Sequence, residues 1–167
     1  MNKLAMARGK AYALDCVAYL GIATATVPLG ILAYRAGWGE QRGAVLAMSA
    51  IPPVIATVLA ARQESGPERS TWGKRRQGLV VAGKRSIQVG FGRALLRNTI
   101  KIAIPWQIGH TLAVGAAFGG FEDRDPTTIV ASVLTYVGLG VLIGSVLYGE
   151  GRGVHDRLAH TRVLAEA

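Results

Sequence analysis

The sequence predicts an all-α membrane protein, a four-helix transmembrane bundle that forms one domain over residues 1–167. Half of the 167 residues are apolar, and the mean hydropathy is positive, at +0.31. Four apolar segments approach or exceed the ~20 residues that a helix needs to cross ~30 Å of hydrocarbon. Because a surface helix of a soluble protein needs a polar face, these segments favour membrane spans. The predicted spans are 11–34, 43–61, 100–120 and 127–149.

Proline interrupts each of the first two predicted spans. Residues 11–34 follow a short basic arm and contain Pro28. Residues 43–61 contain Pro52 and Pro53 near their middle, and adjacent prolines remove backbone hydrogen bonds and bend or break a helix. This interruption either shapes the packing of the helices or forms a flexible gate.

A basic, glycine-rich cytoplasmic loop is predicted between the second and third spans. It begins with a solvated linker over residues 62–69. Residues 79–81 and 86–89 favour strands on either side of a turn, which indicates a short β-hairpin. Residues 93–98 predict an amphipathic helix at the lipid surface. Basic clusters in this loop suit anionic lipid headgroups. These lipid-facing candidates are Lys74, Arg75, Arg76, Lys84 and Arg85.

The third and fourth predicted spans differ in polarity. Residues 100–120 contain Lys101, Gln107 and His110, whereas residues 127–149 are almost entirely apolar. Each of these two spans contains a pair of glycines four residues apart, a spacing that lets helices approach closely in lipid. We therefore expect the two spans to pack tightly.

The distribution of basic residues predicts the orientation in the membrane. The net charge is +9, and fifteen of the nineteen Lys and Arg residues lie in the N-terminal arm, the central loop and the C-terminal tail. Cytoplasmic loops of membrane proteins are enriched in these residues. Both termini are therefore predicted to lie in the cytoplasm, on the inner side of a cell inner membrane. Because the charges flank apolar segments, nucleic acid is not expected as a partner.

No pattern of catalytic or metal-ligating residues is recognisable, so the sequence predicts neither an enzyme nor a bound cofactor or metal. The one cysteine, Cys16, lies within the first predicted span and cannot form an internal disulfide. The chain has no Cys and His spacing typical of a zinc site. Ionisable residues inside the spans are the remaining functional candidates, because charge is costly in hydrocarbon.

Asp15 is the main candidate for a charge inside the membrane. An aspartate at the bilayer centre costs ~2.5–3.5 kcal/mol on insertion scales, so it needs a partner or a task. Arg8 lies seven residues earlier on the same helical face, about 10.5 Å away along the axis, which is long for a direct salt bridge. The candidates for a third group between them are Arg93, Arg97, Asp156 and Arg157.

These residues resemble the RDD family of bacterial membrane proteins, which is named after one arginine and two aspartates. Arg8 and Asp15, in RGKAYALD, match the arginine that starts the first transmembrane helix and the aspartate within it. Asp156, in HDRLAHT, is similar to the second aspartate. His160 replaces the glycine usual in this tail, which leaves the local backbone turn open. Further similarities are TWGKR, the glycine and valines of GLVV, and ALLRN.

The resemblance implies transport of a small ion or solute, and monovalent-cation/proton exchange is suggested for some members. In such a carrier Asp15 and His110 would supply titratable groups within the membrane, beside Lys101 and Gln107. Four short spans leave little room for a pathway, so a carrier of this size would be a homo-oligomer in the lipid bilayer.

The alternative is a structural role for the same residues. Asp15 would then belong to an ion network with Arg8, Arg97 and Asp156 that ties both termini to the central loop. Lys101 would extend its ammonium toward the interface, while His110 and Gln107 would bridge helices. The protein would be a non-transporting accessory or scaffold protein whose basic cytoplasmic face binds anionic lipid or a partner protein.

Overall fold

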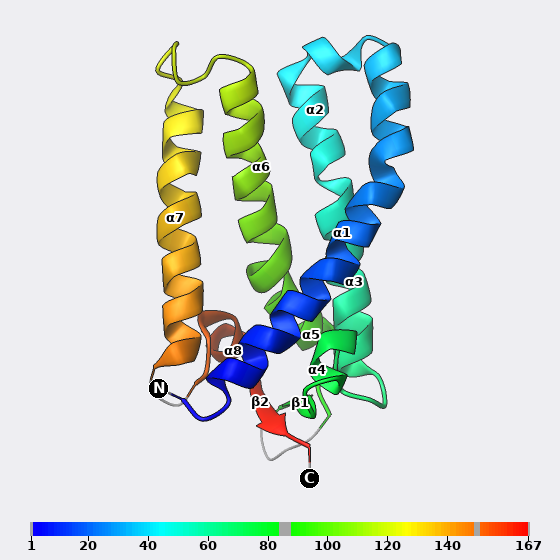
Figure 1. Ribbon diagram of the computed structural model, residues 1–167, viewed down its shortest axis with the longest axis vertical. Coiled ribbons are helices and arrows are strands. Elements are labelled where there is room, and N and C mark those ends of the chain that lie inside the picture. The colour runs from blue at the N-terminus through cyan, green and yellow to red at the C-terminus, as the bar shows by residue number, and fades with distance from the viewer. Residues whose placement is uncertain (1, 84–87, 149–150, 167) are drawn as a thin grey trace.

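The computed structural model describes residues 2–83, 88–148 and 151–166. Long helices rise from a lower end at which the short elements and both termini gather (Figure 1). The long helices are α1 (Ala5–Arg35), α2 (Arg42–Ser49) with α3 (Ile51–Ser65), α6 (Ile104–Ala117) and α7 (Pro126–Leu147). The short elements at the lower end are α4 (Trp72–Arg75), β1 (Leu79–Ala82), α5 (Phe91–Asn98), α8 (Val154–Leu158) and β2 (Arg162–Ala165).

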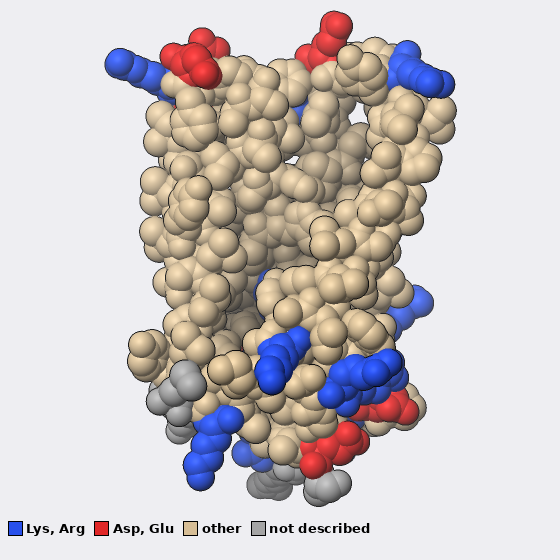
Figure 2. All heavy atoms as spheres, in the orientation of Figure 1, with Lys and Arg blue, Asp and Glu red and all other residues tan. Residues whose placement is uncertain are grey.

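Three helical segments of the described residues are long and apolar enough to cross a membrane. They are Ala5–Arg35, Arg42–Ser65 and Pro126–Leu147. Most large apolar side chains of α1 and α7 remain exposed, as lipid-facing side chains do. Figure 2 shows the corresponding broad band of uncharged side chains between two charged ends. The apolar helices therefore suit a membrane environment.

The predicted count of four membrane helices is not confirmed. In place of the predicted span 100–120, the chain forms a π-helical segment, η3 (Thr99–Ala103), and then α6, which has only 14 residues. At 1.5 Å per residue α6 is about 21 Å long, which is short of the hydrocarbon thickness. Pro105 explains the change of helical type, because it has no N–H to donate to the Lys101 carbonyl four residues earlier.

The second predicted span is interrupted as the sequence indicates. α2 ends at Ser49 and α3 begins at Ile51, directly before Pro52 and Pro53. Prolines are well tolerated in the first turn of a helix, whose N–H groups have no intrahelical acceptor. α3 also continues to Ser65, four residues beyond the predicted end of this span.

The β-prone part of the central loop forms β1, but its partner is the C-terminal tail and not the predicted second strand. β1 and β2 are antiparallel, with Leu79 opposite Ala165 and Ala82 opposite Arg162. All four residues of β1 are buried. Half of the predicted turn and half of the second hairpin strand fall on residues 84–87, outside the described residues, and the described residues Gln88 and Val89 are not in a strand. The small sheet joins the tail to the central loop.

Part of the buried core lies between α1, α3 and η3, where two alanines pack against larger side chains. One cluster brings Tyr19 of α1 against Ala56 and Ala60 of α3 and Ile102 of η3. Alanine lets helix backbones approach closely, and these contacts hold α1, α3 and η3 together above the lower end. The polar residues described next lie on the same three elements and on the short helices below them.

Candidate functional site

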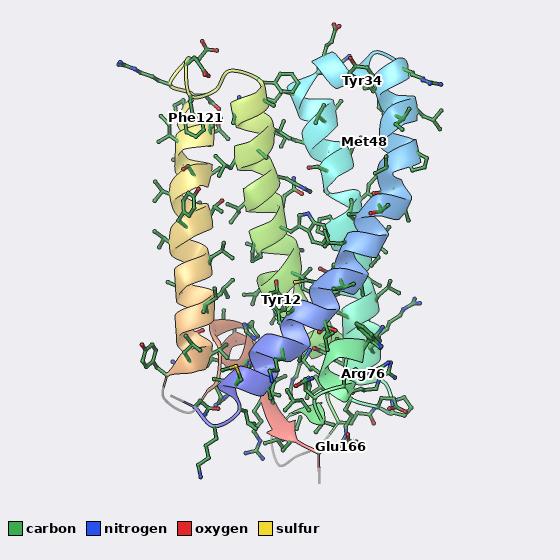
Figure 3. The ribbon with its side chains drawn as sticks, in the orientation of Figure 1. Tyr12, Tyr34, Met48, Arg76, Phe121 and Glu166 are labelled. Atoms are coloured by element: carbon green, nitrogen blue, oxygen red, sulfur yellow. The ribbon has the colours of Figure 1, made fainter. Side chains whose placement is uncertain are left out.

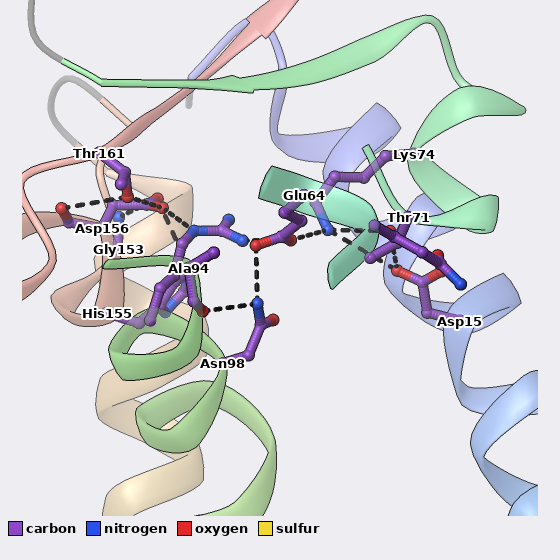
Figure 4. A network of polar contacts seen from close by, with 12 residues as sticks. Asp15, Glu64, Thr71, Lys74, Ala94, Asn98, Gly153, His155, Asp156 and Thr161 are labelled. Atoms are coloured by element: carbon purple, nitrogen blue, oxygen red, sulfur yellow. Dashed lines mark hydrogen bonds and ion pairs between the residues drawn. The ribbon is translucent and has the colours of Figure 1, made fainter. Parts of the chain in front are cut away.

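Six charged residues from five helices form a buried network at the lower end of the molecule. Figure 4 shows its central part as a chain of dashed contacts from α8 to α1. The side chains are 10% exposed or less. In spatial order the residues are Arg8, Asp156, Arg97, Glu64, Lys74 and Asp15.

Asp15 is only 2% exposed, and three groups from the start of the central loop satisfy its carboxylate. Thr71 Oγ1 donates a hydrogen bond to Oδ2 at 2.6 Å, and the Gly73 N–H donates to Oδ1 at 2.8 Å. Lys74 Nζ lies 3.8 Å from Oδ2. A Cβ on Gly73 would collide with the Ala11 carbonyl oxygen, so only glycine allows this approach. Asp15 therefore attaches α4 to α1.

Glu64 lies at the centre of the network and was not a candidate in the sequence analysis. Its side chain is fully buried, and its Oε1 accepts hydrogen bonds from Lys74 Nζ at 2.7 Å and from Arg97 Nη1. Its Oε2 accepts a hydrogen bond from Asn98 Nδ2 at 2.7 Å. The sequence placed Glu64 in the solvated linker over residues 62–69. The available signal was an acidic residue within one turn of the end of an apolar segment.

Asp156 joins the tail to the N-terminal arm and to α5. Its Oδ2 lies 2.6 Å from Arg8 Nη2, and its Oδ1 lies 2.9 Å from Arg97 Nε. The Gly153 N–H also donates to Oδ2, at 3.1 Å. Burial alone would raise the pKa of Asp156, but the adjacent Arg97 guanidinium outweighs burial and holds it well below the usual value. For the neighbouring His155, burial and then Arg97 lower the pKa to about 3, so its imidazole is neutral at pH 7.

The arginine and the first aspartate of the sequence motif belong to one network without direct contact. Arg8 reaches Asp15 only through Asp156, Arg97, Glu64 and Lys74. Two other candidates for an intermediate group lie elsewhere. Arg93 is exposed, and the exposed Arg157 donates from Nε to the Arg152 carbonyl at 3.1 Å.

His110 and Gln107 bond to the interruption between α2 and α3. Pro53 has no N–H, so the Ser49 carbonyl four residues earlier lacks its helical donor. His110 Nδ1 lies 3.2 Å from that carbonyl, and Trp106 Nε1 donates to His110 Nε2 at 3.2 Å. Since a carbonyl only accepts and an indole only donates, these contacts select the neutral tautomer protonated on Nδ1. Gln107 Nε2 lies 3.3 Å from Ser49 Oγ.

Lys101 on η3 is the cation of this region that lacks a carboxylate partner among the described residues. Its Nζ lies 4.8 Å from the centroid of the Tyr12 ring, a cation–π contact. Figure 3 shows Tyr12 between α1 and α6. With Lys101 included, this region contains four basic side chains and three carboxylates, so the basic groups outnumber the acidic ones by one.

A cavity of about 220 Å³ lies beside Lys101, between α1, η3 and α7. Figure 2 shows the face of the molecule hollowed between the α1 side and the α7 side. The apolar part of the lining comes from α7 and from α1, β1 and α6, and the basic side chains come from α1, α4, α5 and η3. The basic lining residues are Arg8, Lys74, Arg97 and Lys101, and the apolar ones from α7 are Leu139, Leu142, Ile143, Val146 and Leu147.

The predicted lipid-facing residues are only partly on the surface. Lys74 is 5% exposed and its ammonium lies in the network, because two carboxylates are close enough to pair with it. Arg75 and Arg76 are exposed, and the Arg76 guanidinium lies 5.6 Å from the centroid of the Trp72 ring. Figure 3 shows Arg76 beside α4 at the lower end. Lys84 and Arg85 lie outside the described residues.

A second polar contact joins the helices at the opposite end. Arg42 Nη2 lies 2.5 Å from Asp125 Oδ2, and the Thr128 hydroxyl donates to the same carboxylate oxygen at 2.6 Å. Asp125 is also the N-cap of α7, since it accepts from the backbone N–H groups of Thr127 and Thr128. Side-chain hydrogen bonds from Thr128 and Arg42 lower the pKa of Asp125.

These features define a helical integral membrane protein with a buried ion network at one end. Comparison with known families matches residues 4–160 to the RDD family, and the chain belongs to that family. No significant match was found among curated proteins or solved structures. Within the described residues, no group of three or more His, Cys, Asp and Glu side chains is placed to hold a metal ion.

Proposed function

We propose that this protein carries a small, negatively charged solute across the cell inner membrane and binds it in the cavity beside Lys101. The observation that carries the proposal is that Lys101, a basic side chain beside the network, has no carboxylate partner among the described residues. A cation at membrane depth without a carboxylate partner is costly, and such residues commonly mark a binding site or a pathway. The solute would supply the missing negative charge.

The carboxylates of the network are poorly suited to bind a transported cation. Asp15, Glu64 and Asp156 each accept at least two hydrogen bonds and each has a basic partner. A cation in the cavity would also lie beside several positive side chains. Of the small ions that the family resemblance suggests as transported solutes, we therefore propose an anion. In this proposal His110 bridges two helices and takes no part in proton transfer.

The proposed topology has four spans with both termini in the cytoplasm. The five residues of η3 and the 14 of α6 together come close to the ~30 Å thickness of the hydrocarbon. An even number of spans agrees with the excess of basic residues at the lower end, which would face the cytoplasm. Because the cavity beside Lys101 is small, we propose a homo-oligomer and no catalytic step.

Flux into proteoliposomes tests the carrier. The purified full-length protein is assayed with chloride, inorganic phosphate and acetate gradients, and in parallel with sodium, potassium and lithium gradients and a pH-sensitive dye. Lys101→Met removes the charge at nearly constant side-chain length, and Lys10→Met removes an exposed charge on α1 as the matched control. We expect anion flux that Lys101→Met lowers about tenfold or more and Lys10→Met preserves.

Two outcomes would contradict the proposal. Anion flux that is equal in the wild type and Lys101→Met would remove the cavity from the pathway. Proton flux driven by sodium, potassium or lithium, lost in a folded Asp15→Asn variant, would instead establish cation/proton exchange.

The second candidate is an accessory protein whose cytoplasmic face binds anionic lipid, and the exposed side chains of Arg75 and Arg76 favour it. Arg75 is the last residue of α4 and Arg76 follows it. The Arg76 guanidinium lies near the Trp72 ring, and Trp72 is 37% exposed. An arginine beside an amphipathic ring suits the headgroup region. Replacing both arginines with glutamine would then weaken enrichment of phosphatidylglycerol around the protein and leave solute flux unchanged.

A further inference from the structure

We propose that the cavity binds the monoanionic headgroup of an amphiphile that enters sideways from the membrane between α1 and α7. The headgroup would pair with Lys101, and its hydrocarbon chain would lie against the apolar side chains of α7. This inference rests on the proposed function only in that both place the ligand in the same cavity.

The charge of the site selects one negative charge. Arg97 and Lys74 already contact carboxylates, and Arg8 pairs with Asp156 through Nη2. Of the four basic side chains that line the cavity, Lys101 is the one without a carboxylate partner among the described residues, and its contact with the Tyr12 ring leaves its N–H donors for a ligand. A carboxylate or a phosphodiester has the single charge that would make the site neutral.

The shape of the site selects a ligand with a long apolar part. The volume of about 220 Å³ is below the ~300–1,000 Å³ typical of sites that enclose a small molecule. It therefore holds a headgroup but not a whole amphiphile. The cavity lining includes Leu139 and Ile143, whose side chains are exposed on α7. A hydrocarbon chain leaving the cavity would pass along these side chains into the bilayer.

The division of the lining between elements agrees with an amphiphile. The basic lining side chains come from α1, α4, α5 and η3, whereas α7 contributes only apolar side chains, from Leu139 to Leu147. A ligand between these elements would therefore meet charge on one side and apolar side chains on the other. A freely diffusing inorganic ion would use the charge but would gain nothing from the apolar walls.

Spin-label spectroscopy tests this inference without measuring transport. The full-length protein is placed in phosphatidylcholine nanodiscs with a trace of spin-labelled oleate, phosphatidylglycerol or phosphatidylcholine. We expect the spectra of the two anionic probes to contain a component from immobilised spin label. For phosphatidylcholine this component should be about tenfold weaker. Comparison of oleate with phosphatidylglycerol distinguishes a fatty acid from a phospholipid, and added inorganic phosphate tests whether a free anion competes.

Two pairs of variants separate charge from shape. Lys101→Met should weaken immobilisation of the anionic probes about tenfold, whereas Lys10→Met should not. Leu142→Trp retains all charges but fills the cavity wall, and it should also weaken immobilisation. Val141→Trp, at an exposed position of α7 outside the cavity lining, should have no effect.

The inference is overturned if anionic and zwitterionic probes are immobilised equally, or if Lys101→Met and Leu142→Trp bind like the wild type. Small-anion flux without immobilised amphiphile would reject this inference and leave the proposed carrier standing. Immobilised amphiphile without flux of any solute would support this inference and reject transport.

Discussion

Glu64→Gln removes one negative charge from the centre of the ion network while it preserves the shape of the side chain. The carboxylate of Glu64 pairs with Lys74 and Arg97, and both basic side chains are almost fully buried. Removing one partner of a buried ion pair typically costs ~3–5 kcal/mol, because the opposite charge stays buried without compensation. At ~2–4 °C per kcal/mol for a chain of this size, the midpoint of thermal unfolding should fall by about 6–20 °C.

The assay is thermal unfolding of the purified protein in detergent, followed by intrinsic fluorescence, with Glu68→Gln as the matched control. Glu68 is 65% exposed and lies 3.9 Å from Arg75, so this variant should shift the midpoint by less than about 2 °C. The double variant Glu64→Met with Arg97→Met should lose less stability than the two single variants lose in sum. A midpoint for Glu64→Gln within about 2 °C of the wild type would refute the central role of Glu64.

Three further outcomes follow from the network and the tail. Asp15→Asn should lower both membrane yield and the unfolding midpoint, because Lys74 loses a nearby carboxylate; unchanged stability would separate Asp15 from the fold. His160 has a φ of +53°, so His160→Gly should stabilise by about 1 kcal/mol in chemical unfolding, and a destabilised variant would contradict this strain. Because burial lowers the pKa of His155 to about 3, stability should decrease as pH falls below about 6.5, where only the unfolded chain takes up this proton. His155→Gln should flatten that decrease between pH 7 and 5, and an unchanged pH profile would show that another group titrates.

Local sequence predicted the parts of the fold that depend on composition and on proline. The apolar segments became long helices, and the interruption at Pro52 and Pro53 lies where the sequence places it. The second break was harder to foresee. Pro105 lies within the third apolar segment, and its effect on helical type shortens α6 below the length that a hydropathy pattern indicates.

The motif residues were visible in sequence, but their connections were not. Spacing along a helix showed that Arg8 and Asp15 are far apart, and it left the intermediate groups open. The structure places Glu64 and Lys74 among those groups, although the sequence assigned one to a solvated linker and the other to the lipid surface. Burial of these side chains depends on contacts between helices, which a local pattern does not contain.

By itself, the sequence determined the class of the molecule, its family motif and the end at which its basic residues gather. Hydropathy and charge are summed along the chain, so a single sequence is enough to read them. Only the tertiary structure decided the pairing of β1 with the tail and the position of Lys101 beside the network without a carboxylate partner. Both depend on groups distant in sequence, such as Arg8 and Asp156, which folding brings to 2.6 Å.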